Sequence, residues 1–169
     1  LKVRDRNQVE VDMGPPRFEP AAIPFRRDAV ANDYSLNVAG ELLTIGAVSM
    51  GNPHAVLRVD TLDDALVSRL GPAIEAHEDF PQRCNAGFMV VRDSTHIQLR
   101  VFERGVGETL ACGSGACAAV VYGRLMGWLD KRVTVELPGG KLTVDWPGKG
   151  KNVRLTGPTA ISFEGTIRL

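Results

Sequence analysis

The stretch "ERGVGETLACGSGACAAVVYG", residues 103–123, decides the fold because its second half predicts a helix that is apolar on almost every side. The helix should begin near Ser114, run through "GACAAVVYGRLM" and end at Gly127. Its first half carries almost no polar side chains, so the rest of the chain must bury it on most sides.

The segments around this helix carry the alternating apolar or β-branched residues that are typical of strands. A proline-rich connection, "MGPPRFEPAAIPF", follows the first of them. Many strands with one apolar helix predict an α+β fold, in which a strongly curved mixed β-sheet or barrel is wrapped around that central helix. The predicted strands cover residues 2–13, 41–50, 54–60, 86–93, 96–104, 152–158 and 160–169, with a hairpin over 132–146 that turns at 138–140.

A second helix is predicted over residues 62–70, where leucines recur at every fourth position. Thr61 and Asp64 resemble a capping box at its start. Gly71 and Pro72 should stop the helix, because proline cannot donate a helical hydrogen bond. We expect this helix to lie on the outer surface of the sheet.

The composition favours one domain, or a large part of a two-domain protein, since 44% of the 169 residues are hydrophobic. Twenty basic residues balance twenty acidic ones without a long run of like charge, so neither nucleic acid nor an anionic membrane is expected as a partner. The sequence lacks an apolar run of about 20 residues, which a membrane span requires, and the apolar segment of a signal peptide. We therefore expect a soluble, cytoplasmic protein whose three cysteines are reduced.

Cys112 falls just before the predicted apolar helix, where unpaired backbone N–H groups and the helix dipole favour an anion. That position tends to convert a thiol into a thiolate, which is a base or nucleophile near neutral pH. Gly113 and Gly115 let a ligand approach the backbone, whose amides could hold a carboxylate. The alternative is that the thiol only fills space in a tightly packed helix, which is the role expected of Cys117 and Cys84.

Two opposite charges precede this segment, because Glu103 and Arg104 end a strand a few residues before the helix. The two charged groups and the Cys112 thiol should converge where strand meets helix, and loops at such ends commonly carry function. Alternatively, Glu103 and Arg104 form an exposed ion pair that is worth only about 0.5 kcal/mol.

These motifs resemble the diaminopimelate epimerase family of cofactor-independent amino-acid epimerases. The resemblance covers nearly the whole chain and implies the fold of that family, diaminopimelate as the small-molecule substrate, and neither cofactor nor metal. It rests on four stretches in the family's order: "MGNPHAV" (50–56), "LGPAIEAHEDFPQRCNAGF" (70–88), "ERGVGETLACGSGACAA" (103–119) and "VELPGGKL" (135–142).

The resemblance implies a role for each matching residue at the reacting end of the substrate. Cys112 would be one of two catalytic cysteines, acting as acid or base at the α-carbon. Gly113 and Ser114 would donate backbone N–H groups to the reacting carboxylate. Glu103 would contact the reacting ammonium and tune the thiol, and His54 would lie near the other catalytic cysteine.

The resemblance also implies how the distal end of the substrate is recognised. Arg104 would pair with the distal carboxylate, while Asn52 and Asn85 would recognise the distal amino-acid end. His77 would be structural. These residue types suit the reaction, because a carbanion needs rigid donors in a dry pocket and inversion needs one base on each face of the carbon.

The second catalytic cysteine of the family lies in a Cys-Gly-Asn-Gly motif of an N-terminal domain, which "RCNAG" around Cys84 does not reproduce. By resemblance, residues 14–158 are the C-terminal epimerase domain, and residues 1–13 and 159–169 are strands at its junction with that absent domain. The parent protein would be a homodimer that converts LL-2,6-diaminoheptanedioate to the meso isomer, for lysine and cell-wall precursor synthesis. This chain alone would be inactive.

Three other functions remain as alternatives. A related cofactor-independent racemase or isomerase would act on proline-like or aromatic substrates. A cysteine hydrolase would use Cys112 with His54 and form an acyl-enzyme. A non-catalytic half would serve only for binding or dimerisation, and ligand binding without proton exchange would reveal it.

Overall fold

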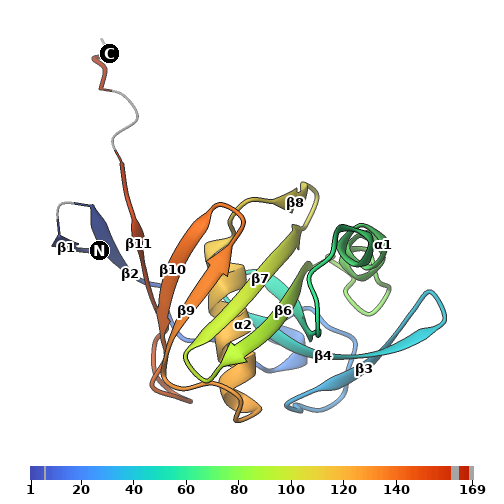
Figure 1. Ribbon diagram of the computed structural model, residues 1–169. Helices are drawn as coiled ribbons and strands as arrows, with labels where there is room; N and C mark the ends of the chain where they lie inside the picture. The colour runs from blue at the N-terminus through green and yellow to red at the C-terminus, as the bar shows by residue number, and fades with distance from the viewer. Residues whose placement is uncertain (6, 161–163, 168–169) are drawn as a thin grey trace.

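The computed structural model describes residues 1–5, 7–160 and 164–167. In this part of the chain, eleven strands form one sheet with an α-helix on each side (Figure 1). Neither of the two α-helices is long and apolar enough to span a membrane. The helices are α1 (Asp64–Glu75) and α2 (Gly113–Leu125), with a short 3-10 helix at Pro20–Ala22. The strands are β1 (Lys2–Asp5), β2 (Gln8–Asp12), β3 (Tyr34–Val38), β4 (Glu41–Ser49), β5 (Pro53–Arg58), β6 (Asn85–Asp93), β7 (His96–Glu103), β8 (Gly107–Thr109), β9 (Arg132–Leu137), β10 (Gly140–Asp145) and β11 (Arg154–Pro158).

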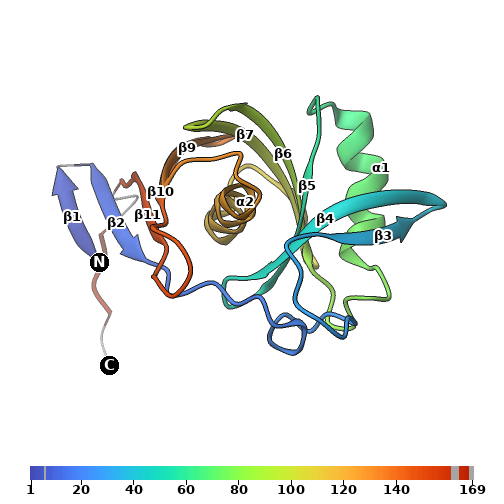
Figure 2. The same cartoon turned by 90° about the horizontal axis from the view of Figure 1, so that it is seen from below.

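The sheet is mixed and curved, but it is open. Its strands follow the order β1-β2-β11-β10-β9-β7-β6-β5-β4-β3, and β8 pairs with β7 outside this path. The pairs β5/β6 and β7/β9 are parallel, and the other pairs are antiparallel. Among the described residues β1 and β3 do not pair with each other, so the expectation of a barrel is wrong. Figure 2 shows the reason: the β1–β2 hairpin and the far end of the β3–β4 ribbon extend away from α2 in different directions.

Helix α2 occupies the concave side of the sheet, as predicted (Figure 2). Every residue from Gly115 to Gly123 is buried, because α2 contacts β4, β5, β6, β7, β10 and β11. The helix begins after Cys112, whose extended backbone makes it the N-cap, and ends before Gly127, whose φ of +74° favours glycine. The sequence prediction of a buried apolar helix is therefore confirmed.

Helix α1 lies on the outer side of the sheet, also as predicted, and packs on β6 and β7. Its start differs from the expectation, because Asp63 rather than Thr61 is the N-cap. The Asp63 Oδ1 atom accepts a hydrogen bond from the Leu66 backbone N–H at 2.7 Å. The carboxylate satisfies one of the donors that a helix start leaves unpaired.

The expected stop of this helix at Gly71 and Pro72 is wrong, since α1 continues to Glu75. Pro72 is exposed and costs the helix one hydrogen bond. Beyond it, Ile74 is fully buried, and Gly71 lets the helix approach the Phe102 ring closely. This packing stabilises the last turn enough to offset the proline.

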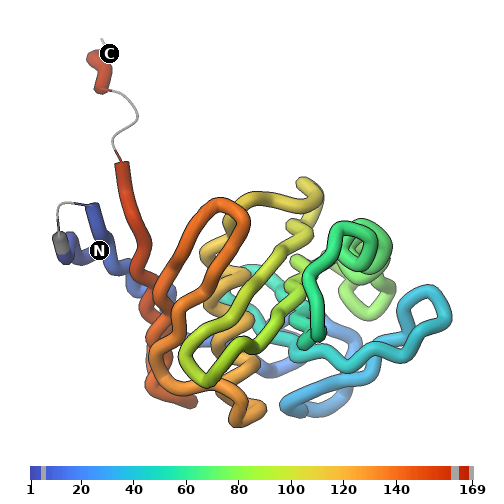
Figure 3. Tube along the Cα trace, viewed as in Figure 1, coloured from blue at the N-terminus to red at the C-terminus, as the bar shows by residue number. Residues whose placement is uncertain are grey.

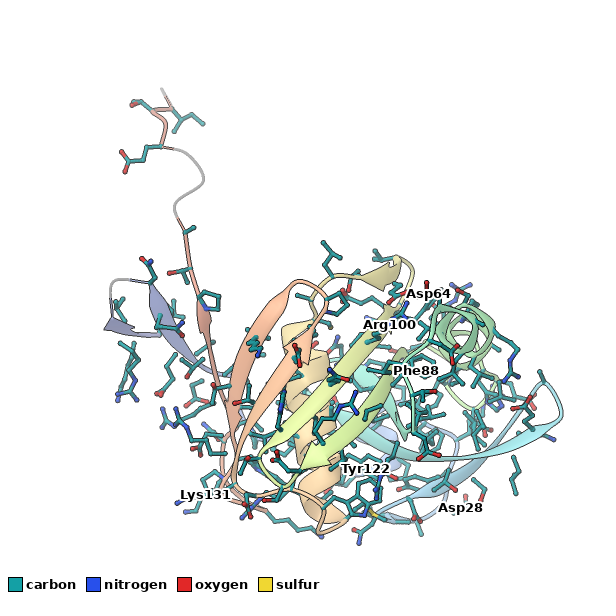
Figure 4. All side chains as sticks on the ribbon, viewed as in Figure 1. Asp28, Asp64, Phe88, Arg100, Tyr122 and Lys131 are labelled. Atoms are coloured by element: carbon teal, nitrogen blue, oxygen red, sulfur yellow. The ribbon has the colours of Figure 1, made fainter. Side chains whose placement is uncertain are left out.

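Neighbouring residues of the central strands face two different hydrophobic cores. Val56 and Met89 face the core around α2, which includes Tyr122, while the adjacent residues Leu57 and Phe88 face the core under α1. Figure 4 labels one member of each core, Tyr122 and Phe88. Because both faces are buried, these strands carry nearly continuous apolar runs.

Two short strands, β3 and β8, lie outside the segments that the sequence predicts as strands. Strand β3 alternates buried and exposed residues, and β8 pairs with the end of β7. The alternation of Tyr34, Leu36 and Val38 was a usable signal for β3. Strand β8 has only three residues, which is too short for a periodic pattern.

The ends of the chain also differ from the expectation. Residues 2–13 contain two antiparallel strands instead of one, with Val3 opposite Val9. Strand β2 then pairs with β11, so the two lie side by side at the end of the sheet beyond β10 (Figure 3). Of the strand expected over 160–169, residues 161–163 and 168–169 lie outside the described residues, and residues 164–167 contain no strand.

Candidate active site

The thiol of Cys112 lies where the end of β7 meets the start of α2. Strand β8 folds back on β7, which returns the chain from Glu103 to the helix. The Cys112 Sγ–H donates to the Glu103 carboxylate at 3.2 Å, and the Ser114 hydroxyl lies 3.7 Å from the same sulfur. The predicted convergence of Glu103 and Cys112 is therefore confirmed.

The thiol is protonated more firmly than expected from its place at a helix N-terminus. Burial raises the pKa of Cys112 above its ordinary value, and the Glu103 carboxylate raises it further. The Ser114 hydroxyl and the Gly115 backbone N–H lower the pKa but do not reverse the shift. The tendency of a helix N-terminus to favour a thiolate is therefore outweighed here by desolvation and by the nearby negative charge of Glu103.

A chain of hydrogen bonds leads from this thiol to His54. The Asn52 Nδ2 atom donates to the Ser114 Oγ at 3.4 Å, and the Asn52 Oδ1 atom lies 3.0 Å from the His54 Nε2. His54 is only 1% exposed. Its burial, together with the charge of Arg104, lowers the pKa of His54 to about 3. The imidazole is therefore neutral near pH 7, with Nε2–H as the donor to Asn52.

Asn85 and Arg104 form a second group beside this chain. Asn85 is buried and lies opposite His54 in the parallel β5/β6 pair. Its carboxamide donates to the Pro53 carbonyl at 3.0 Å and accepts the Arg104 backbone N–H at 3.0 Å. The Arg104 side chain is exposed and donates to the Gln82 carbonyl at 3.2 Å. The guanidinium is thus accessible, whereas the Asn85 amide ties two backbone segments together.

Gly113 and Ser114 are the first two residues of α2 and are half-buried. The backbone N–H groups at such positions have no carbonyl partner within the helix. Together with the helix dipole they can hold a carboxylate close to the Cys112 sulfur.

The other two cysteines are structural, as expected. Cys84 is fully buried, and its Sγ–H donates to the Ile74 carbonyl at 3.4 Å. Burial, and after it the Glu75 carboxylate, raise the pKa of Cys84. Burial also raises the pKa of Cys117 to about 12. All three cysteines are free thiols.

His77 is structural too. Its Nε2 atom lies 2.9 Å from the Asn37 carbonyl, and its Nδ1 atom accepts the Asp79 backbone N–H at 3.1 Å. The neutral ring with Nε2–H satisfies both contacts, and it joins the segment after α1 to strand β3.

Sequence reasoning missed two residues that support the site. The Thr109 hydroxyl donates to the second Glu103 oxygen at 2.5 Å, so it orients the carboxylate toward Cys112. Glu75 accepts the Gly105 backbone N–H at 2.9 Å. Thr109 lies inside the stretch that decides the fold, but the sequence carried no signal that joins Glu75 to Gly105.

A further cavity adjoins the strand that carries Thr109. This cavity of about 530 Å³ is lined by Asp64, Arg100, Glu108, Thr109, Leu110 and Pro138. Arg100 pairs with both carboxylates, and its contact with Asp64 at 2.8 Å lies beside the start of α1 (Figure 4). Its charge is therefore already matched within the protein. In the described part of the chain, no cluster of three or more histidine, cysteine or acidic residues is placed to hold a metal ion.

The curved mixed sheet around an apolar helix defines the fold class of this protein, and a solved epimerase shares that fold. A solved hydroxyproline epimerase from Agrobacterium vitis aligns with 89% of this chain and 50% of its own, with a TM-score of 0.63 and 15% identity. At that identity the likeness shows the fold alone. The sequence profile of diaminopimelate epimerase matches residues 46–161, and the chain belongs to the diaminopimelate epimerase family.

Curated relatives agree with this assignment. The diaminopimelate epimerase of Alkalilimnicola ehrlichii is 59% identical over 169 residues, which are 100% of this chain and 61% of that protein. The diaminopimelate epimerase of Pseudomonas entomophila is 57% identical over 169 residues, with the same coverage of 100% and 61%. The chain thus spans 61% of the length of these two relatives.

Proposed function

We propose that the protein that carries this chain is a diaminopimelate epimerase. It converts LL-2,6-diaminoheptanedioate to the meso isomer, for lysine and cell-wall precursor synthesis, by cofactor-independent proton transfer at the α-carbon. The observation that carries the proposal is the Cys112 thiol, which donates to the Glu103 carboxylate at 3.2 Å at the N-terminus of α2.

Cys112 is the acid or base on one face of the α-carbon. Its raised pKa suits the direction in which it supplies a proton to the carbanion. In the other direction it accepts the proton as a thiolate, which the Ser114 hydroxyl and the Gly115 N–H stabilise. The first amides of α2, those of Gly113 and Ser114, hold the reacting carboxylate, and one such donor is worth about 3 kcal/mol in related oxyanion sites.

Glu103 couples substrate binding to the reactivity of this thiol. In the free protein its carboxylate raises the pKa of Cys112, after the larger effect of burial. A substrate ammonium that binds Glu103 offsets the negative charge, so the pKa of the thiol falls when the substrate arrives. The base is thereby activated only in the complex.

Arg104, Asn52 and Asn85 recognise the distal end of the substrate. The exposed guanidinium of Arg104 can bind a carboxylate through two parallel hydrogen bonds. Asn52 is hydrogen-bonded to His54, and Asn85 lies opposite His54 in the β5/β6 pair. In this proposal both amides contact the distal amino-acid end. This arrangement favours a long substrate with two charged ends.

The opposing base lies outside the 169 residues in this proposal. Cys84 and Cys117 are both fully buried, with 0% of their surface accessible, so neither thiol can reach a ligand. Residues 14–158 then form the C-terminal epimerase domain, residues 1–13 and 159–169 lie at its junction with a second domain, and His54 lies near the second cysteine. The functional protein is a homodimer. These 169 residues alone should not epimerise, and robust conversion by them would place the second base among them.

The hydrolase alternative has less support. A nucleophilic cysteine needs a base within hydrogen-bond reach, but His54 donates to Asn52, and its pKa of about 3 suits a fixed neutral donor. The group that contacts the Cys112 sulfur is the Glu103 carboxylate, which disfavours a resting thiolate.

Proton exchange in deuterated water tests the proposal. The full-length protein is incubated with LL-diaminopimelate, and deuterium at the α-carbon is followed by mass spectrometry together with formation of the meso isomer. Cys112→Ala should abolish both, whereas Cys117→Ala, on the same helix, should retain them because that thiol only fills the core. Ester hydrolysis without exchange would indicate a hydrolase, exchange only with proline-like substrates a related racemase, and binding without exchange a non-catalytic module.

A further inference from the structure

Two buried side chains from other elements accept hydrogen bonds from the backbone of the turn after β7. The Arg104 backbone N–H donates to the Asn85 Oδ1 atom at 3.0 Å, and the next N–H, that of Gly105, donates to the Glu75 Oε1 atom at 2.9 Å. Asn85 begins β6 and Glu75 ends α1, so two separate elements fix two consecutive amides. Gly105 has a φ of +73°, a conformation that favours glycine.

Glu75 is an unexpected residue at its position. It is the last residue of α1 and only 5% exposed. The C-terminal end of a helix carries partial negative charge, so the dipole disfavours a carboxylate there. Burial adds a desolvation cost, which only strong partners can offset. Neither the helix nor the core explains an acidic residue here, and its bond to Gly105 therefore points to a role in the turn.

The second partner of Glu75 is held in a strained conformation. Arg83 contacts the Glu75 carboxylate at 3.2 Å, although its own side chain is 60% exposed. Its φ is +58°, which a non-glycine residue adopts only where surrounding contacts hold it. The ion pair with Glu75 and the bond from the Arg83 N–H to the Phe80 carbonyl, at 2.7 Å, are two such contacts.

The residues next to the fixed amides are those of the proposed site. Glu103 precedes them and contacts Cys112, while the Arg104 side chain leaves the turn between the two bonds. A turn that is free to rotate would let the Arg104 guanidinium move without displacing Glu103, which Thr109 and Cys112 hold independently. Loss of the Glu75 contact should therefore affect Arg104 more than the thiol.

We propose that Glu75 is a positioning residue, which fixes the Arg104 turn through Gly105 and so sets the guanidinium on the distal carboxylate of the substrate. Glu75 does not touch the substrate, and its role in substrate selection rests on the function proposed above. It adds a determinant of specificity that lies on the outer side of the sheet, at the end of α1.

Two conservative variants of Glu75 in the full-length protein separate the effect of side-chain length from the effect of charge. Glu75→Asp keeps the charge but is one methylene too short to contact Gly105, whereas Glu75→Gln keeps the reach and loses the charge. We expect Glu75→Asp to raise the KM for LL-diaminopimelate about tenfold with little change in kcat, and Glu75→Gln to raise it less than about threefold. A role in charge balance or stability alone predicts the opposite order, and that result, or an unchanged KM in both variants, would overturn the proposal.

Hydrogen exchange in the substrate-free protein supplies a readout that does not depend on activity. The peptide that spans residues 103–110 should exchange its amides about tenfold faster in Glu75→Asp, and near the parent rate in Glu75→Gln. The exposed neighbour Glu78 offers the matched control, since Glu78→Asp should change neither KM nor exchange. If the parent protein fails to exchange the α-proton, the proposed function falls, while the amide exchange still decides whether Glu75 holds the turn. Parent-like exchange in Glu75→Asp would remove Glu75 from that role.

Discussion

The two helices each place an ionisable side chain at one end, and the two ends differ in what they can do. At the N-terminus of α2, the dipole favours negative charge, and Cys112 lies beside the half-buried residues Gly113 and Ser114. At the C-terminus of α1, the dipole disfavours negative charge, and Glu75 is enclosed by Gly105 and Arg83. The start of α2 therefore suits a side chain that exchanges a proton, whereas the end of α1 suits a side chain that makes fixed structural contacts.

The three cysteines show the same difference within one residue type. Cys117 lies only one and a half turns from Cys112 on α2, about 5 residues at roughly 3.6 per turn, yet burial raises its pKa to about 12. Cys84 lies in the other core, where it donates to a backbone carbonyl. Only Cys112 combines burial with a hydroxyl and a backbone N–H that lower its pKa. The position of a cysteine relative to the helix end therefore decides whether its thiol is suited to proton transfer or only packs in the core.

The two helices also differ in how tightly they pack on the two faces of the sheet. The largest effect is expected at Gly46, on the concave face that covers α2. A Cβ at Gly46 would overlap the ring of Tyr122, which is 1% exposed and cannot move aside. Gly46→Ala should lower the free energy of unfolding by about 3 kcal/mol, the upper range for overpacking. Urea denaturation measures it.

The matched variant on the outer side is Gly71→Ala. A Cβ there would lie 2.8 Å from the half-buried Phe102 ring, which can shift, and alanine favours the helix by about 1 kcal/mol. The net change should stay below about 1 kcal/mol. Equal losses at Gly46 and Gly71 would show that the two faces are packed with the same tolerance.

The next effect concerns the pH dependence of stability through His54. Its pKa is about 3 in the folded protein, against 6.5 for the ordinary side chain, so the unfolded state binds more protons between these values. Stability should therefore fall as the pH is lowered, by about 2 kcal/mol from pH 7 to pH 5. His54→Gln should remove this part of the slope in urea denaturation at the two pH values. An unchanged slope would mean that the imidazole is hydrated and titrates normally.

The smallest effect is a shift in the reactivity of Cys112 with pH. Glu103→Gln removes a carboxylate that raises the pKa of the thiol, so the midpoint of alkylation should move to lower pH. Peptide mapping after iodoacetamide treatment identifies the labelled residue and its rate. Glu108→Gln, on the neighbouring strand β8, should leave the midpoint in place, because Glu108 pairs with Arg100. A shift to higher pH in Glu103→Gln would contradict the proposed tuning.

Much of the candidate site could be predicted because its parts are close in sequence. Glu103 and Cys112 are separated by a single tight return of the chain, and the apolar run after Cys112 marks a helix start. The resemblance then added Asn52 and His54, which the structure joins to Ser114 by hydrogen bonds. The sequence could not give the net direction of the Cys112 pKa shift, because the burial around a helix end depends on residues that are distant in the chain.

The sequence by itself determined most of the central strands, from β4 to β7 and from β9 to β11, and that α2 lies buried inside the curve of the sheet, since both follow from the periodicity of apolar residues. Only the tertiary structure decided that α1 passes through Pro72, that the sheet stays open, and that Glu75 meets Gly105. Each of these depends on contacts between segments far apart in the chain: Ile74 against the sheet, the outward path of β3 and β4, and a hydrogen bond across 30 residues. Local propensities differ by about 1 kcal/mol or less for most residues, so such contacts can override them wherever burial is large.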